Sequence, residues 1–296
     1  MDIAEPKLAA GSETAPPEPL TKSGLRDEEQ LYFTGGMEPA TPSVISTSSK
    51  YLNDPYYRDA FAQISLRRAG VDVPTTYTIP MVGKAIGAVT DYGEFARLIE
   101  EEKASKPEFA EWLRRRRHTH FQVEDMAGYA PGTLGHHIWD FLVSTGYRMD
   151  KLQMANVTVT NDIDYVSQRR GNLHDIEHMV TGFGPNQAGE LALLWANITS
   201  CAGYFSPTLA HHMSAGQTFL ATAAITRTSL HYREAFPTML EAVQAGIAMG
   251  RALKRPFMME PWEEMLDWQV AAIVEHLELT PGPGKAWDWT SDAARG

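Results

Sequence analysis

The 296-residue sequence is poor in cysteine, in basic residues and in long apolar runs, and each shortage excludes a class of protein. Its single cysteine, Cys201, excludes an intramolecular disulfide framework and a cysteine-based zinc module. Lys and Arg total 26 against 37 Asp and Glu, which gives a formal net charge of −11 and argues against nucleic-acid binding. No stretch approaches the roughly eighteen uncharged apolar residues that span a bilayer, so any membrane contact is expected to be peripheral.

Both ends of the chain have the composition of tails. The first thirty residues have neither the basic and apolar regions of a secretory signal nor the Arg-rich character of a mitochondrial transit peptide. Residues 1–50 are rich in Pro, Ser, Thr, Glu and Gly and predict a flexible tail. The Pro-Gly repeat that ends at residue 284 predicts a C-terminal tail at 281–296. Residues 51–280 contain no linker and no repeat, and predict one domain.

The apolar periodicity of residues 51–280 is helical. Asp91 is placed to cap one helix, and Pro107 is placed to begin the next. The only strand-like alternation, at residues 157–159, is too short to build a sheet. We therefore predict an all-α fold, a single multi-helix domain. The expected helices are 56–70, 91–103, 107–117, 133–145, 163–181, 187–201, 218–231, 237–254 and 261–279.

Two histidines in the middle of the chain have the spacing of one helix face. His174 and His178 are four residues apart, so on a helix they stand about 40° apart, and Asp175 is rotated about 100° from His174. Imidazoles and carboxylates are ligands of divalent metals. A histidine pair at this spacing also occurs without a metal, so the interpretation depends on what faces the pair.

A register argument brings Glu190 to the same place. Gly182 is a natural helix end, and Asn186 can cap a following helix. His178 lies four residues before Gly182 and Glu190 lies four residues after Asn186, so in an antiparallel hairpin both stand about 6 Å from the turn. Packed helices approach to roughly 8–10 Å, which lets the two side chains converge. Glu190 begins a mostly apolar helix, and a buried carboxylate must be paired or bind a metal.

The pattern His-Asp-x-x-His, followed by eleven residues and a Glu, resembles the signature of the coenzyme Q (ubiquinone) biosynthesis protein 4 family. His174, Asp175, His178 and Glu190 match it position by position. Two features depart from the family pattern: residues 270–274 contain no Arg, and the first fifty residues have no counterpart, so a paralogue acting on another isoprenoid is an alternative. The resemblance covers residues 51–279, with looser matches at Tyr165, Gln168, Arg169, Thr181, Gly182, 189–192, Trp195, 131–135, 250–252, Trp262 and Glu263.

The resemblance implies an all-helical protein of ubiquinone biosynthesis with a divalent metal, usually taken as zinc, with iron or manganese as alternatives. The implied metal ligands are His174, Asp175, His178 and Glu190. The implied substrate is a polyprenylated aromatic lipid at the membrane surface, which loses the carboxyl group of ring carbon 1 by decarboxylation or oxidative decarboxylation. We accordingly expect a cytoplasmic, homo-oligomeric lyase that is peripheral at the inner membrane and contacts other quinone-biosynthesis enzymes.

Catalytic roles are predicted for Glu190, Asp175 and Arg169. A guanidinium suits a carboxylate or phosphate, so Arg169 is a candidate to bind an anionic substrate group, with an ordinary ion-paired arginine as the alternative. Four protein ligands are typical of a closed structural zinc, whereas a catalytic zinc keeps one position open. A structural metal that pins the hairpin is therefore an alternative to a catalytic one.

Two other functions compete with a lyase. One is a non-catalytic prenyl-lipid binder that presents intermediates to partner enzymes, and the other is a zinc hydrolase similar in logic to His-Glu-x-x-His peptidases. A prenyl tail needs a long apolar slot, for which small residues can leave room between helices, although ordinary close packing explains the same pattern. These small residues are Ala242, Gly246, Ala248 and Gly250.

Overall fold

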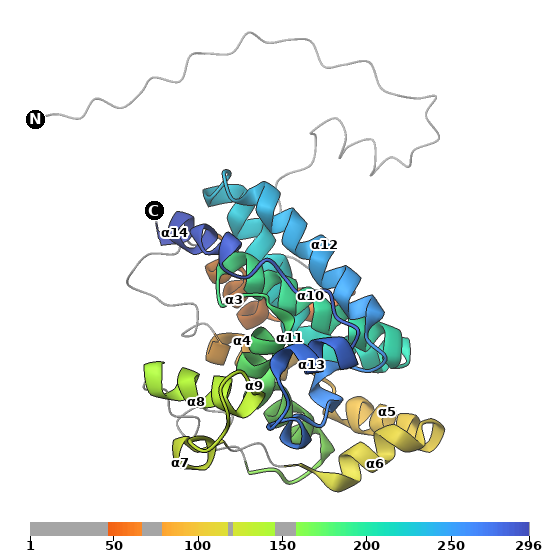
Figure 1. Cartoon of the computed structure of the whole chain (residues 1–296). Coiled ribbons are helices and arrows are strands. Elements are labelled where there is room, and N and C mark those ends of the chain that lie inside the picture. Colours follow the sequence, from red (N-terminus) through yellow and green to blue (C-terminus); the bar gives the residue numbers. More distant parts are fainter. Residues whose placement is uncertain (1–46, 67–78, 118–120, 146–157, 296) are drawn as a thin grey trace, which may run out of the picture. The chain divides into compact units, whose positions relative to one another are not determined.

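The computed structural model describes residues 47–66, 79–117, 121–145 and 158–295, and this part of the chain is all-α (Figure 1). It contains no β-strand, only an isolated bridge between Thr133 and Gln269. The elements are α2 (Lys50–Asn53), α3 (Pro55–Leu66), α4 (Ile79–Val89), α5 (Tyr92–Ser105), α6 (Pro107–Arg115), α7 (Val123–Met126), α8 (Leu134–Thr145), α9 (Asp162–Thr181), α10 (Gln187–Tyr204), α11 (Pro207–His231), α12 (Phe236–Ala252), η3 (Phe257–Met259), η4 (Trp262–Glu264), α13 (Val270–His276), η5 (Gly284–Trp287) and α14 (Trp289–Arg295).

Local signals placed several helix ends correctly. The Asp91 carboxylate accepts a hydrogen bond from the backbone N–H of Glu94 at 2.9 Å and so caps α5, while Pro107 occupies the first position of α6. Helix α11 begins at Pro207, well before the predicted start at residue 218. Helix α4 was not predicted. Of the short alternating segment, residue 157 lies outside the described residues, and 158–159 belong to no regular element.

The segment 261–279 is not the single helix that its pattern predicted. It forms η4, a turn and then α13. The Trp262 side chain is fully buried, and its indole N–H donates to the Phe257 carbonyl at 3.0 Å. The carbonyls of Leu266 and Trp268 accept hydrogen bonds from the N–H groups of Gly135 and Leu134 at 2.9 Å, so they satisfy the start of α8 instead of continuing a helix.

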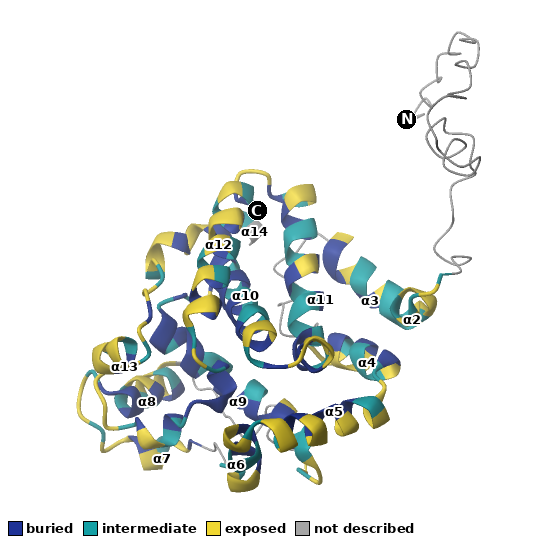
Figure 2. Cartoon of the chain, turned by 90° about the vertical axis from the view of Figure 1, so that its right-hand side faces the viewer, coloured by how far each residue is buried: buried dark blue, intermediate teal, exposed yellow. Residues whose placement is uncertain are grey.

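Helix α10 packs against both α11 and α12, and in Figure 2 α9 and α10 carry mostly the colours of buried and half-buried residues. The contact between α10 and α12 is close because it is built from small residues. A Cβ added at Gly246 would lie only 2.1 Å from the Ala192 carbonyl oxygen. Close packing therefore explains Ala242, Gly246 and Gly250, which are buried, whereas Ala248 is exposed. The contact at Gly246 leaves no slot for a prenyl tail.

Helices α3 to α6 join this centre through two of the further apolar clusters. One cluster joins α3 and α4 to α11, with Phe219 at its middle. The second joins α5 and α6 to the first half of α9, where Trp112 and Tyr165 lie 5.0 Å apart between ring centroids. None of the helices in the described ranges has the length and apolar character needed to cross a bilayer.

The end of the chain is folded rather than a tail. The predicted tail at 281–296 instead forms η5 and α14, which pack against α10, and Trp287 and Thr290 are buried. Residues Ser48–Gly296 form one compact unit. The domain thus extends past residue 280, while the predicted N-terminal tail lies almost wholly outside the described residues.

Candidate metal centre

The predicted turn between the two central helices is present. Helix α9 ends at Gly182, whose φ of +68° lies in the left-handed region that favours glycine. Asn186 then caps α10, because its side-chain oxygen accepts a hydrogen bond from the Gly189 N–H at 2.8 Å. The chain folds back on itself at the residues that the sequence indicated.

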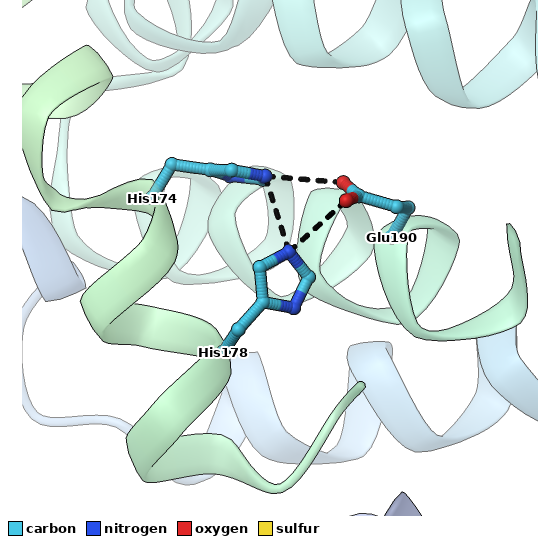
Figure 3. Close-up of side chains that lie close together, drawn as sticks. All are labelled: His174, His178 and Glu190. Carbon is cyan, nitrogen blue, oxygen red and sulfur yellow. Dashed lines mark hydrogen bonds and ion pairs between the residues drawn. The ribbon is translucent and has the colours of Figure 1, made fainter. Parts of the chain in front are cut away.

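Three side chains from this hairpin converge (Figure 3). His174 Nε2 lies 3.1 Å from Glu190 Oε2 and 3.1 Å from His178 Nε2. His178 Nε2 lies 3.2 Å from Glu190 Oε1. Among the described residues, this is the one group of three or more His, Cys, Asp or Glu side chains that can hold a metal ion together. The register argument for His178 and Glu190 is confirmed.

A backbone carbonyl orients one of the two rings. His178 Nδ1 lies 2.7 Å from the carbonyl oxygen of Phe183, and a carbonyl can only accept, so Nδ1 carries the hydrogen. The other ring nitrogen, Nε2, then faces His174 and Glu190. Fixing the tautomer through the second ring nitrogen is the usual arrangement of a metal-binding histidine.

The charges of the cluster depend on one another. Burial lowers the pKa of His174, but the hydrogen bond to Glu190 and the negative charges of Glu190, Glu177 and Asp175 outweigh it and raise that pKa to about 9. Burial raises the pKa of Glu190, but its bonds to His174 and His178 outweigh this effect and hold the pKa well below its usual range. The cluster therefore places a carboxylate against imidazole nitrogens, a donor set suited to a cation.

The spacing of these donors fits a divalent metal. Bonds of about 2.0–2.1 Å to a tetrahedral zinc place neighbouring donors about 3.3 Å apart. Similar bonds in an octahedral site place them about 3.0 Å apart. The observed 3.1–3.2 Å agrees with both geometries. The His174 and Glu190 side chains keep 39% and 41% of their surface exposed, so the group is open to solvent on one side.

Asp175 lies beside this group but is not one of its members. It is half-buried on α9, and burial raises the pKa of its carboxyl against the opposing charges of His174 and His178. The charges interact, but the carboxylate does not join the three converging donors. A role of Asp175 as a fourth ligand stays a prediction.

Arg169 is buried in an ion pair and does not have the role predicted for it. Its side chain is only 1% exposed and is ion-paired to Glu263, with Nη2 3.1 Å from Oε2. Its Nε donates to the Met258 carbonyl at 3.1 Å, and Nη2 donates to the Glu260 carbonyl at 2.8 Å. We therefore correct the expectation that Arg169 binds a substrate anion: it is the ion-paired arginine of the alternative.

Sequence reasoning missed a buried polar pair beside the cluster. Asn197 donates to Glu177 Oε2 at 2.7 Å, and burial raises the pKa of Glu177. Glu177 lies three residues after His174 on the same helix, a spacing that could have identified it from the sequence. Arg170, four residues before His174, donates to the Gln217 side chain at 2.9 Å and so joins α9 to α11.

A comparison with known protein families identifies the family of this chain. The sequence profile of the coenzyme Q (ubiquinone) biosynthesis protein Coq4 family matches residues 71–283. The chain belongs to the Coq4 family. The matched range contains both helices of the candidate metal centre and ends just before η5 and α14. Membership places this Coq4 protein in ubiquinone biosynthesis.

A solved structure shares the fold. It is the crystal structure of a protein provisionally named a ubiquinone biosynthesis protein, from Nostoc punctiforme. The identity is 22% and the TM-score is 0.56, over 74% of this chain and 95% of the other. At this identity the likeness supports the all-α fold. No curated protein sequence matches the chain.

Proposed function

We propose that this Coq4 protein is a metal-dependent lyase that removes the carboxyl group from ring carbon 1 of a polyprenylated hydroxybenzoate, by decarboxylation or oxidative decarboxylation. The observation that carries the proposal is the convergence of His174, His178 and Glu190 at 3.1–3.2 Å on an open face. Membership of the Coq4 family supports a role in ubiquinone biosynthesis. The three converging donors support a metal-dependent reaction.

The number of donors favours a catalytic over a structural metal. A closed structural zinc has four protein ligands, whereas catalytic zinc has three and keeps a position open. Two histidines and one carboxylate with open positions are also the ligand set of non-haem iron oxygenases. We therefore propose a divalent metal at His174, His178 and Glu190, with zinc first and iron or manganese as alternatives.

When bound there, a divalent cation acts as a Lewis acid toward a phenol or carboxylate oxygen. The chain's own residues prepare this site: Glu190 compensates positive charge, Phe183 holds the His178 ring, and the exposed edge of His174 leaves an approach for substrate. Asp175, beside the donors, is the proposed catalytic carboxyl that carries a proton toward the ring.

The two versions of the reaction differ in what replaces the carboxyl group. In simple decarboxylation the bond from ring carbon 1 to the carboxyl breaks, carbon dioxide leaves, and the electron pair left on the ring takes a proton. In oxidative decarboxylation a hydroxyl replaces the carboxyl, and an external oxidant such as dioxygen is consumed. The mass of the product distinguishes a hydrogen from a hydroxyl at this carbon.

The same proposal covers the partners. A polyprenyl substrate partitions into lipid, so we propose that the protein works peripherally at the inner membrane, on the cytoplasmic side. Self-association and contacts with other quinone-biosynthesis enzymes stay predictions that follow from this setting.

The test is elemental analysis of the wild type beside His178→Ala and Glu190→Ala, with organic extraction of each sample. The exposed His137 of α8 gives a matched control, His137→Ala. We expect close to one zinc, iron or manganese per chain in the wild type and the control, and its loss in both ligand variants. A metal-free wild type that releases a prenyl lipid would contradict the lyase and favour the non-catalytic binder.

A further inference from the structure

The C-terminal segment, residues 282–291, holds the turn between the two helices of the metal centre. Two backbone hydrogen bonds join them: Gly282 N–H donates to the Thr181 carbonyl at 2.8 Å, and Gly284 N–H donates to the Gly182 carbonyl at 3.0 Å. These carbonyls end α9, where no intrahelical partner is available. The segment thus satisfies the end of the helix that carries both histidines.

The same segment satisfies the start of α10. The Gln187 N–H donates to Ser291 Oγ at 3.2 Å, and the Ala188 N–H donates to Thr290 Oγ1 at 3.3 Å. The cap residue Asn186 donates its side-chain N–H to Asp288 Oδ1 at 3.0 Å. The helix that carries Glu190 is therefore fixed at its first turn by side chains of the C-terminal segment.

An aromatic stack links the segment to a metal-binding ring. Trp287 lies parallel to Phe183, with an interplanar angle of 9° and 6.1 Å between ring centroids, and both side chains are buried. Phe183 supplies the carbonyl that accepts the Nδ1 hydrogen of His178. Displacing Trp287 frees Phe183, and with it the carbonyl that sets the direction of His178 Nε2.

We propose that the C-terminal segment is a positioning element of the metal centre, with Trp287 as its main positioning residue. It acts on His178 through Phe183, and on Glu190 through the first turn of α10. Most of the segment lies beyond the range that matches the Coq4 profile, so this device is a feature of this chain outside the matched family range. The inference rests on the proposed metal function.

The experiment measures metal affinity separately from stability. Loss of an interaction that orients a ligand weakens metal binding about 10–100-fold. In the full chain we expect Trp287→Ala to weaken zinc binding, measured by competition with a chromophoric chelator, by that factor. It should also alter the visible spectrum of bound Co²⁺. Trp287→Phe keeps the aromatic stack, so its zinc affinity should stay within a few-fold of the wild type and its Co²⁺ spectrum should match that of the wild type.

Two controls separate positioning from general damage. Trp289, two residues on and 41% exposed, should tolerate Trp289→Ala without change in zinc affinity. Phe109→Leu, in the cluster around α6, should lower the unfolding temperature of the metal-free protein and leave the Co²⁺ spectrum unchanged. If Trp287→Ala does not fold, Thr290→Val, which removes the bond to the Ala188 N–H, carries the same test.

The outcomes are distinguishable. A wild type that binds no metal overturns the proposed function and this inference together. A wild type that binds metal while Trp287→Ala keeps its affinity and its Co²⁺ spectrum overturns the positioning role alone. An affinity loss shared equally by Phe109→Leu also overturns it, because a general loss of stability then explains the effect.

Discussion

Arg169 and Glu263, ninety-four residues apart in the sequence, form an ion pair in which the guanidinium is almost completely buried. The same guanidinium binds the carbonyls of Met258 and Glu260, so it ties α9 to the segment that contains η3 and η4. Because all these partners belong to the protein itself, the Arg169 guanidinium stabilises the fold. The family-like Trp-Glu pair after residue 261 thereby receives a structural explanation.

We expect Arg169→Met to destabilise the protein by about 3–5 kcal/mol, because it leaves Glu263 and two carbonyls without their buried partner. Chemical denaturation of the metal-free chain measures the effect. The exposed pair of Lys254 and Glu278 is the control, and Lys254→Met should leave the free energy of unfolding unchanged. Normal stability of Arg169→Met with impaired substrate binding would restore the role that the sequence suggested.

Asp175 and Glu190 should differ in their effect on metal binding. Glu190→Gln replaces the carboxylate among three converging donors with a neutral amide, a much weaker ligand, and we expect it to abolish binding at micromolar metal. Asp175→Asn removes a neighbouring charge, and we expect affinity to fall by no more than about 10–100-fold while turnover is lost. Isothermal titration of both variants with zinc decides the matter. Equal loss of metal in the two would make Asp175 the fourth ligand.

The close contact between α10 and α12 allows a prediction about the effect of added volume on stability. Gly246→Ala places a methyl group 2.1 Å from the Ala192 carbonyl oxygen, so the helices must separate. We expect a loss of about 1–3 kcal/mol in the free energy of unfolding. Gly216 of α11 has open space where its Cβ would lie, so Gly216→Ala should stabilise by up to about 1 kcal/mol. Thermal unfolding of the two variants compares them directly.

The hairpin of α9 and α10 was predictable because the signals for its two helix ends are local. Gly182 and Asn186 mark two helix ends within five residues, and the fixed helical rise then places His178 opposite Glu190. The helix starts at Asp91 and Pro107 were predicted correctly for the same reason. In each case the residue acts on backbone within about one helical turn of itself, through its own conformation or through a capping hydrogen bond.

The errors concern contacts between distant parts of the chain. Arg169 and Arg170 are adjacent, and sequence spacing does not say that the first would meet Glu263 while the second meets Gln217. The C-terminal segment looked like a tail because its Pro and Gly residues break regular patterns, yet Trp287 is buried against Phe183. Tertiary packing determines both the partners of the two arginines and the position of the C-terminal segment. No local sequence pattern encodes such packing.

The last prediction concerns acid stability and Glu102, which joins α5 to the start of α11. Its buried carboxylate lies 2.8 Å from Lys106 Nζ and accepts a hydrogen bond from the Ser206 N–H at 3.2 Å. Burial raises the pKa of Glu102, but the bonds to Lys106 and Ser206 outweigh it and lower the pKa from 4.5. A carboxyl with a lower pKa in the folded state stabilises the fold above its unfolded pKa.

That stabilisation is present above about pH 4.5 and is lost as the pH falls through the lower folded-state value. Glutamine cannot ionise, so Glu102→Gln should destabilise the protein by about 1–3 kcal/mol at pH 7, and the difference from wild type should shrink toward pH 3. Urea denaturation at several pH values measures this difference. Glu101→Gln, an exposed neighbour on the same helix, should have little effect throughout. A constant deficit of Glu102→Gln from pH 7 to pH 3 would mean that shape, rather than charge, is what the α5–α11 junction needs.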